Sequence, residues 1–241
     1  MSRPYDIITF DCYGTLVDWR SGISAAFARA AAARGCAVDE DSVLELHTRF
    51  EQSVQQRPYT RYRTVLTEVE RLMCRELGWG SERPEAFLAN SVPTWPVFPD
   101  TNRALEHLKA AGYRLGILSN IDNDLLAATR RQFTVEFDLL VTAEDVRSYK
   151  PAEGHFRSAR QLIGGNRWLH AAQSYYHDIV PAFNLGVSSV WINRLHERLS
   201  GVATPDADVA NLDGLVEWLE SVPRRATPPG PQRKAYMTRD E

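Results

Sequence analysis

The sequence predicts an α/β protein in which a doubly wound parallel sheet carries an inserted helical subdomain. Three observations support this fold class. A buried strand opens the chain and ends at Asp11, four helical segments then follow one another without a strand, and from Asp100 onward helices alternate with strands. Alternation on this scale favours a parallel, Rossmann-like sheet with right-handed crossovers.

The composition sets the outer limits. The chain has 241 residues, of which 44% are hydrophobic and 24% charged, as is ordinary for a soluble globular protein. A formal net charge of −3 gives no reason to expect nucleic acid or a membrane surface as a partner. No apolar run approaches the roughly 18 residues of a membrane span, and no signal region precedes the first strand. We therefore expect a cytoplasmic protein.

The three cysteines give no metal or disulfide signal. Cys12, Cys36 and Cys74 are far apart and form no CxxC pair. Neither a disulfide framework nor a zinc site is supported, and reduced thiols fit best.

The opening strand is a β-branched and aromatic run, residues 7–10, followed by Asp11 and by a Gly14-Thr15 turn. Open α/β sheets bind ligands at the carboxyl ends of their strands. Asp11 is therefore a candidate for the functional site.

The next segments have helical spacing of apolar residues and contain no strand signal. Four helices are predicted, over residues 21–35 with Ser21 as N-cap and Gly35 as stop, 39–58 ended by Pro58, 60–78, and 85–90. Consecutive helices cannot be crossovers of a parallel sheet, and a proline-rich segment, residues 92–99, closes them off. We predict a helical cap over residues 18–94, a core over residues 1–17 and 95–223, and a disordered, Pro-rich and charged tail over residues 224–241.

From Asp100 onward the pattern alternates. The predicted order is helix 100–112, strand 113–120, helix 124–131, strand 137–142, a loop to Pro151, a helix to residue 163, strand 168–172, a polar turn 173–178, a helix to residue 185, strand 188–192 and helix 211–221.

Polar residues stand at the ends of the predicted strands. After Asp11 come Ser119 with Asn120, then Lys150, then the polar turn that ends in Asp178. The last three groups are about one βα unit apart, so all should point into one crevice at the carboxyl edge of the sheet.

These residues carry a family resemblance. DxYGTL at 11–16, LSN at 118–120, YKP at 149–151 and the turn ending in Asp178 resemble the four motifs of the haloacid dehalogenase superfamily. The resemblance covers residues 5 to about 195, with the helical insert where that superfamily places a cap.

At two positions this sequence departs from the motifs of the superfamily's phosphatases, and these differences indicate which branch it resembles. Its phosphatases carry a second Asp two residues after the nucleophile to protonate a leaving alkoxide, and this position is Tyr13. A halide leaves without a proton. The fourth motif would supply a magnesium-binding carboxylate at Gln173, which is an amide. The DxY form thus resembles the metal-independent L-2-haloacid dehalogenase branch, and no metal or cofactor is expected.

The resemblance implies a role for each motif residue. Asp11 would attack the Cα of a small 2-substituted carboxylate and form an ester, releasing halide. Lys150 would lower the pKa of Asp11 and keep it ionised, Thr15 would fix its side chain, and Asp178 would orient or deprotonate the hydrolytic water. Ser119 matches a group that engages the substrate carboxylate, and Asn120 one that faces the halide.

Other substrate contacts are predicted less directly. Tyr13, Ser174, Tyr175 and His177 are expected near the substrate. Arg49 is the candidate for a cap arginine that binds the halide, in competition with Arg57, Arg61 and Arg63. The family's fourth-motif Ser and Asn fall on Gln173 and Tyr175, and its Tyr after the lysine is Phe156.

These differences leave alternatives open. One is hydrolysis of a strained ring amine such as azetidine-2-carboxylate, another is a magnesium-dependent phosphatase, and a third is a binding protein without catalysis. A small-molecule carboxylate is the expected partner, and an amphipathic cap helix could serve a homodimer.

Overall fold

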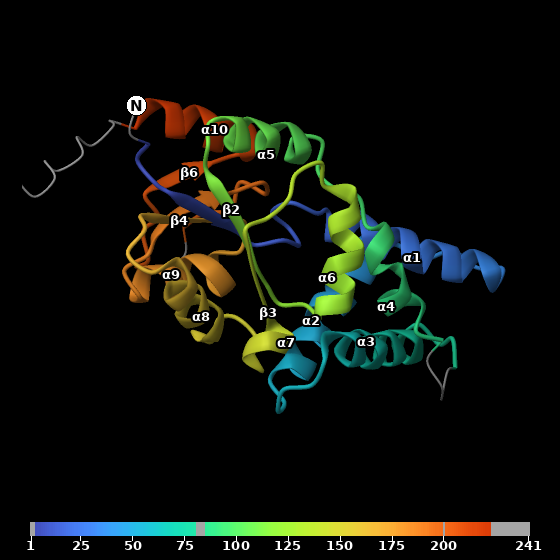
Figure 1. The fold of residues 1–241 in the computed structure, drawn as a ribbon. Coiled ribbons are helices and arrows are strands. Elements are labelled where there is room, and N and C mark those ends of the chain that lie inside the picture. Colours follow the sequence, from blue (N-terminus) through green and yellow to red (C-terminus); the bar gives the residue numbers. More distant parts are fainter. Residues whose placement is uncertain (1–2, 81–84, 200, 223–241) are drawn as a thin grey trace, which may run out of the picture.

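A computed structural model describes residues 3–80, 85–199 and 201–222. The predicted tail, residues 224–241, lies outside the described residues. Six parallel strands form one sheet in the order β3-β2-β1-β4-β5-β6, so the predicted fold class is confirmed (Figure 1). The strands are β1 Ile7–Phe10, β2 Arg114–Ser119, β3 Leu139–Thr142, β4 Trp168–Ala172, β5 Ser188–Ile192 and β6 Ala207–Val209.

The first strand occupies the centre of the sheet. β1 pairs with β2 on one side and β4 on the other, with Phe10 in register with Ile117 and Ala171. Strand order reverses at β1, and ligands of open α/β sheets bind outside the carboxyl ends at such a switch point. Asp11 follows β1 directly and is therefore placed at this point.

Successive side chains of β1 point alternately into two apolar layers, one on each face of the sheet. Ile8 faces the larger cluster, which includes Leu105 of α5 (Thr101–Ala110) and Leu215 of α10 (Leu212–Ser221). Ile7 faces the other side, with Phe156 of α8 (Gly154–Ile163) and Ala182 of α9 (Val180–Asn184). A period of two directs neighbouring residues to opposite faces, so both layers cover the sheet.

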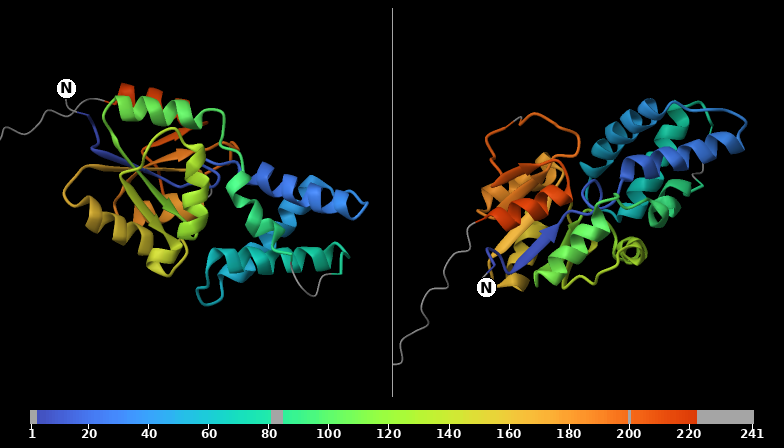
Figure 2. Two further views of the ribbon diagram at one scale, coloured as in Figure 1. Left: turned by 45° about the vertical axis from the view of Figure 1, so that its right-hand side comes forward. Right: turned by 90° about the horizontal axis from the view of Figure 1, so that it is seen from above.

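Four helices lie between β1 and α5 in the chain and stand to one side of the sheet (Figure 2). They are α1 Trp19–Ala33, α2 Glu40–Gln55, α3 Tyr62–Glu76 and α4 Phe87–Ser91, followed by a 3-10 turn Val92–Thr94. Asp18 caps α1 by accepting the backbone N–H of Ser21, so the helix begins two residues before the predicted start.

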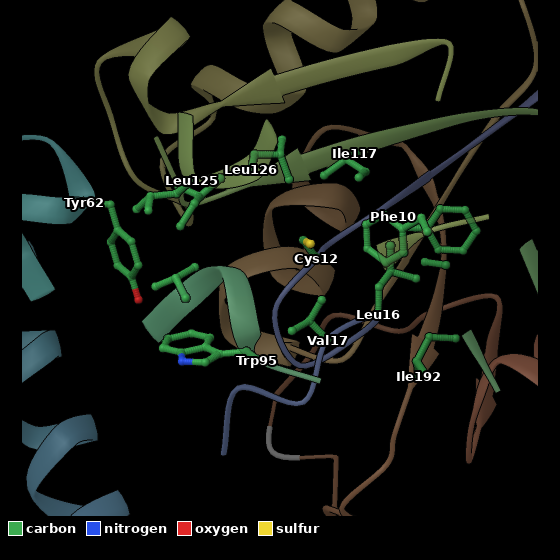
Figure 3. Close-up of a cluster of buried hydrophobic side chains, with 14 of the residues drawn as sticks. Phe10, Cys12, Leu16, Val17, Tyr62, Trp95, Ile117, Leu125, Leu126 and Ile192 are labelled. Carbon is green, nitrogen blue, oxygen red and sulfur yellow. The ribbon is translucent and has the colours of Figure 1, made fainter. Parts of the chain in front are cut away.

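The larger apolar cluster continues from the sheet into these helices. Phe10 and Leu16 share it with Tyr62 of α3 and with Trp95 (Figure 3). Cys12 is fully buried in the same cluster. The helical insert is thus packed against the residues that surround Asp11.

Three short elements were not predicted. α7 (Ala143–Val146) lies in the expected loop, and its capping box between Thr142 and Asp145 is a sequence signal for it. β6 has three residues with Asp208 in the middle, too short for an alternation signal, and forms by pairing with β5. A π-helix, Tyr175–Ile179, occupies part of the polar turn, and α6 (Asn123–Thr129) agrees with its prediction.

No helix within the described residues is both long and apolar enough to cross a membrane.

Candidate active site

Two carboxylates share one lysine at the carboxyl edge of the sheet. Lys150 Nζ donates to Asp11 Oδ1 at 2.9 Å and to Asp178 Oδ1 at 2.6 Å, and a third bond reaches the Leu118 carbonyl at 2.9 Å. These use all three donors of the ammonium. Lys150 is only 2% exposed, so this buried ammonium holds the ends of three motifs together.

Thr15 fixes the other oxygen of Asp11. Its hydroxyl donates to Asp11 Oδ2 at 2.9 Å and accepts the backbone N–H of Gln173 at 2.9 Å. Both carboxylate oxygens of Asp11 are therefore hydrogen-bonded, which orients the group.

A histidine absent from the sequence predictions completes the site. His170 of β4 is fully buried, and its Nε2 lies 2.9 Å from Asp178 Oδ1. Trp168 Nε1 donates to Thr9 Oγ1 at 2.7 Å, and Thr9 Oγ1 lies 2.8 Å from His170 Nδ1. A carboxylate only accepts, so Nε2 carries the proton, and in a neutral ring Thr9 donates to Nδ1.

Burial and charge act against each other on Asp11 and Asp178. Burial raises the pKa of Asp178, but Lys150 and His170 hold it at about 2. For Asp11, burial and the nearby Asp178 keep the pKa above its usual value, although Lys150 and Thr15 lower it. Lys150 lowers the pKa of Asp11 as predicted, but the net shift is upward, because one ammonium serves two buried carboxylates. A poorly solvated carboxylate is also more basic, which suits a nucleophile.

The polar turn places Ser174 and His177 beside this cluster. Ser174 Oγ lies 3.0 Å from His177 Nδ1 and accepts the His177 backbone N–H at 3.1 Å. Burial lowers the pKa of His177, which favours the neutral ring. Tyr175 donates its hydroxyl to the Ala203 carbonyl at 2.9 Å, so only its ring is presented to the site.

In the LSN motif, the hydroxyl of Ser119 has no hydrogen-bond partner among the described residues, whereas the side-chain amide of Asn120 is hydrogen-bonded. Ser119 is 1% exposed, and its Oγ has no hydrogen-bond partner among the described residues. Asn120 Nδ2 donates to the Lys150 carbonyl at 3.1 Å, and its Oδ1 accepts the Lys150 backbone N–H at 2.6 Å. The side chain of Asn120 therefore positions the backbone of Lys150, whereas a contact with the halide was predicted.

Tyr13 is not placed as a general acid. Its hydroxyl pairs with Thr129 Oγ1 at 2.8 Å, its ring meets Trp95 edge to face, and burial raises its pKa.

One open cavity of about 730 Å³ joins these residues to the helical insert. All the predicted site residues except Thr15 and Arg49 line it: Asp11, Tyr13, Ser119, Asn120, Lys150, Ser174, Tyr175, His177 and Asp178. Arg20, His47, Glu51 and Arg194 also line it and were not predicted.

Arg49 is the predicted residue that the structure places elsewhere. Its half-exposed side chain pairs with Glu76 at 3.2 Å and lies over the ring of Phe50. Arg49 and His47 are two residues apart on α2, and a helix turns such neighbours to different faces. His47 points to the cavity, and Arg49 does not.

Within residues 3–80, 85–199 and 201–222, no group of three or more His, Cys, Asp or Glu side chains is arranged to hold a metal ion.

Residues 5–171 match the haloacid dehalogenase-like hydrolase family. The chain belongs to this family. As a haloacid dehalogenase-like hydrolase, it is 28% identical over 218 residues to an (S)-2-haloacid dehalogenase of Pseudomonas putida, an alignment that covers 88% of this chain and 95% of the relative.

Solved structures have the same fold. A defluorinating L-2-haloacid dehalogenase superposes with a TM-score of 0.79 at 23% identity, covering 91% of this chain and 99% of its own. The L-2-haloacid dehalogenase of Xanthobacter autotrophicus with chloropropionic acid covalently bound gives a TM-score of 0.75 at 23% identity, with 91% and 100% covered.

Proposed function

We propose that this hydrolase converts a small (S)-2-haloacid to a 2-hydroxy acid through an ester on Asp11, without a metal ion. The observation that carries the proposal is the oriented Asp11 carboxylate, held by Lys150 on one oxygen and Thr15 on the other. The curated relative from Pseudomonas putida, an (S)-2-haloacid dehalogenase, supports the choice of substrate.

In the first step an oxygen of Asp11 attacks the Cα that bears the halogen. The C–halogen bond breaks and its electron pair leaves as halide, so no proton is needed at the leaving group. The hydroxyl of Tyr13 is hydrogen-bonded to Thr129 and is not placed to act as an acid, and this step needs no acid. Attack from the side opposite to the halogen inverts the configuration at Cα.

In the second step water adds to the carboxyl carbon of the ester, and Asp178 takes its proton. Asp178 Oδ2 is buried and has no hydrogen-bond partner among the described residues, while Oδ1 is bound to Lys150 and His170. Oδ2 is therefore the oxygen suited to accept from water. The bond between the carboxyl carbon of Asp11 and the substrate oxygen then breaks, and the leaving alkoxide takes the proton back from Asp178. Asp11 loses its remaining proton to solvent, and an (R)-2-hydroxy acid is released.

The substrate carboxylate has two suitable partners. The free hydroxyl of Ser119 lies at the carboxyl end of β2, and the Arg20 guanidinium lines the cavity at the start of α1, over the ring of Trp19. The Arg20 guanidinium has no carboxylate partner among the described residues, which suits it to bind the substrate carboxylate.

The free thiols of Cys12, Cys36 and Cys74 support a reducing, cytoplasmic location for the reaction.

A single-turnover experiment tests the proposal. The protein is incubated with (S)-2-chloropropionate in ¹⁸O-water, with and without chelator, and a phosphate-ester panel is run in parallel. We expect halide release that is insensitive to chelator, a mass adduct on Asp11 and ¹⁸O in the Asp11 carboxylate. Asp11→Asn should lose both adduct and halide. Turnover of phosphate esters that requires added magnesium, with no adduct, would contradict the proposal.

A further inference from the structure

The cavity has more acidic than basic side chains. Its lining cations are Arg20, Lys150 and Arg194. Lys150 is bound to Asp11 and Asp178, and Arg194 binds Asp100 at 3.0 Å as well as a backbone carbonyl. Within the described part of the chain this leaves Arg20 as the lining cation without a carboxylate partner. A substrate carboxylate has one such cation available, whereas six acidic side chains line the cavity.

Glu51 of α2 is the best defined of these acids. Its Oε1 accepts from the Tyr62 hydroxyl at 2.6 Å and from Gln55 Nε2 at 3.2 Å, which holds the carboxylate in place. Its Oε2 is 3.9 Å from His47 Nδ1, beyond hydrogen-bond distance. The side chain is 25% exposed. The fixed carboxylate of Glu51 therefore presents to the cavity one oxygen, Oε2, that accepts no hydrogen bond from the described residues.

His47 also lines the cavity and lies one helical turn before Glu51 on α2. It is only 2% exposed, and neither ring nitrogen has a hydrogen-bond partner among the described residues. Its ring packs on Trp19 at 5.7 Å between centroids. Burial lowers the pKa of His47, so the neutral ring offers one acceptor and one donor nitrogen. A buried polar group without a partner is costly, which points to a ligand that satisfies it.

We infer that Glu51 and His47 form a subsite for an ammonium group, so that the favoured substrates are 2-halocarboxylates with a primary amine further along the chain. An ammonium supplies both a positive charge for Glu51 and donors for Oε2 and the His47 ring. An alkyl chain would leave both groups unpaired. The carboxylate of such a substrate would lie toward Arg20 and Ser119. The reaction at Cα rests on the proposed function, but the ammonium subsite does not.

A matched pair of substrates tests the inference. (S)-2-Bromo-5-aminopentanoate and (S)-2-bromohexanoate have the same chain length and differ by an ammonium in place of a methyl group. We expect kcat/KM for bromide release to favour the amine by about tenfold, as for one charge-assisted hydrogen bond. Glu51→Gln should reduce this ratio to near unity, and His47→Leu should lower it. Glu45→Gln, on the exposed face of α2, should keep the wild-type ratio.

A binding measurement separates this inference from the proposed function. Titration calorimetry of the wild-type protein with 5-aminopentanoate and with hexanoate, which have no leaving group, reports the subsite without catalysis. Tighter binding of the amine that Glu51→Gln abolishes would support the subsite even if neither bromoacid were turned over. Equal or tighter binding of hexanoate, or a preference for the amine that survives in both Glu51→Gln and His47→Leu, would overturn it.

Discussion

His170 Nε2 lies 2.9 Å from Asp178 Oδ1, the oxygen that also accepts from Lys150 at 2.6 Å. Two donors on one oxygen leave the other, Oδ2, free of protein partners in the described residues. His170 is itself held through Thr9, which accepts from Trp168. The buried hydrogen bonds from Trp168 through Thr9 and His170 to Asp178 therefore determine which oxygen of Asp178 is left to accept from water. His170 is thus a positioning residue for ester hydrolysis.

His170→Leu should slow hydrolysis of the ester by about tenfold to 100-fold, because a small displacement of an oriented group is costly to catalysis. Formation of the ester should be much less affected, since Asp11 keeps Lys150 and Thr15. Rapid-quench mass spectrometry should therefore show accumulation of the Asp11 adduct. His170→Gln, which retains a donor nitrogen, should restore part of the hydrolysis rate. Equal slowing of both steps in both variants would argue for a purely structural role.

Arg20 and Arg49 offer a direct comparison between the structure and the sequence. Arg20→Met should raise KM for 2-chloropropionate about tenfold through loss of a charge-assisted contact with the substrate carboxylate. Arg49→Met removes an exposed pair with Glu76, which is worth little, and should leave KM unchanged. Steady-state halide release measures both. A rise in KM confined to Arg49→Met would favour the prediction from sequence.

The positions of Asp11, Lys150 and Asp178 could be predicted because each lies in a segment that follows a strand of the parallel sheet. Asp11 and Lys150 lie far apart in the chain, but parallel strands bring their ends to one edge, and their ion pair follows from the order of the motifs. The sheet, with its helical insert, could be predicted from the change of pattern at Asp100. Such features depend on local periodicity, which a single sequence contains.

What could not be predicted depends on how elements meet. His170 lies inside a strand, where a histidine in an apolar run gives no signal of a carboxylate partner. Arg20 falls outside the predicted helix, which starts at Ser21, whereas α1 is capped by Asp18 and includes Arg20. The upward shift in the pKa of Asp11 comes from its burial and from the nearby Asp178. The DxYGTL motif indicates neither of these.

His155 should make stability depend on pH. Burial is the main reason that its pKa is lowered to about 4, and its Nε2 donates to the Ser119 carbonyl at 3.0 Å. Between pH 6.5 and 4 the unfolded chain binds a proton that the native protein does not, so the free energy of unfolding falls as pH falls. A shift of this size corresponds to about 3 kcal/mol over that window.

Urea unfolding of the wild type and of His155→Gln across this range checks the prediction. The variant should lose less stability between pH 6.5 and 4, by up to about 3 kcal/mol. His47 and His177, whose pKa values are also lowered, should still contribute a residual slope in the same direction. Parallel curves for the two proteins would show that His155 is not the group responsible.

Gly22 allows Trp95 to pack against α1 beside the cavity. A Cβ at Gly22 would lie 2.2 Å from Trp95 Cγ and 2.8 Å from its Cβ, so the base of the indole would have to move. The ring has little freedom, because Nε1 donates to Ser91 Oγ at 2.9 Å and the ring contacts Tyr13.

Gly22→Ala should therefore lower the free energy of unfolding by about 1 to 2 kcal/mol, although alanine is the better helix former, because overpacking outweighs propensity. It should also lower kcat/KM for halide release, since Trp95 lines the cavity. Gly165→Ala, in the turn after α8, is the control for an added methyl group without a clash, because no described atom lies within 4 Å of the added Cβ. Urea denaturation midpoints decide the matter: a gain in stability for Gly22→Ala would mean that α1 and Trp95 are packed less closely than the structure places them.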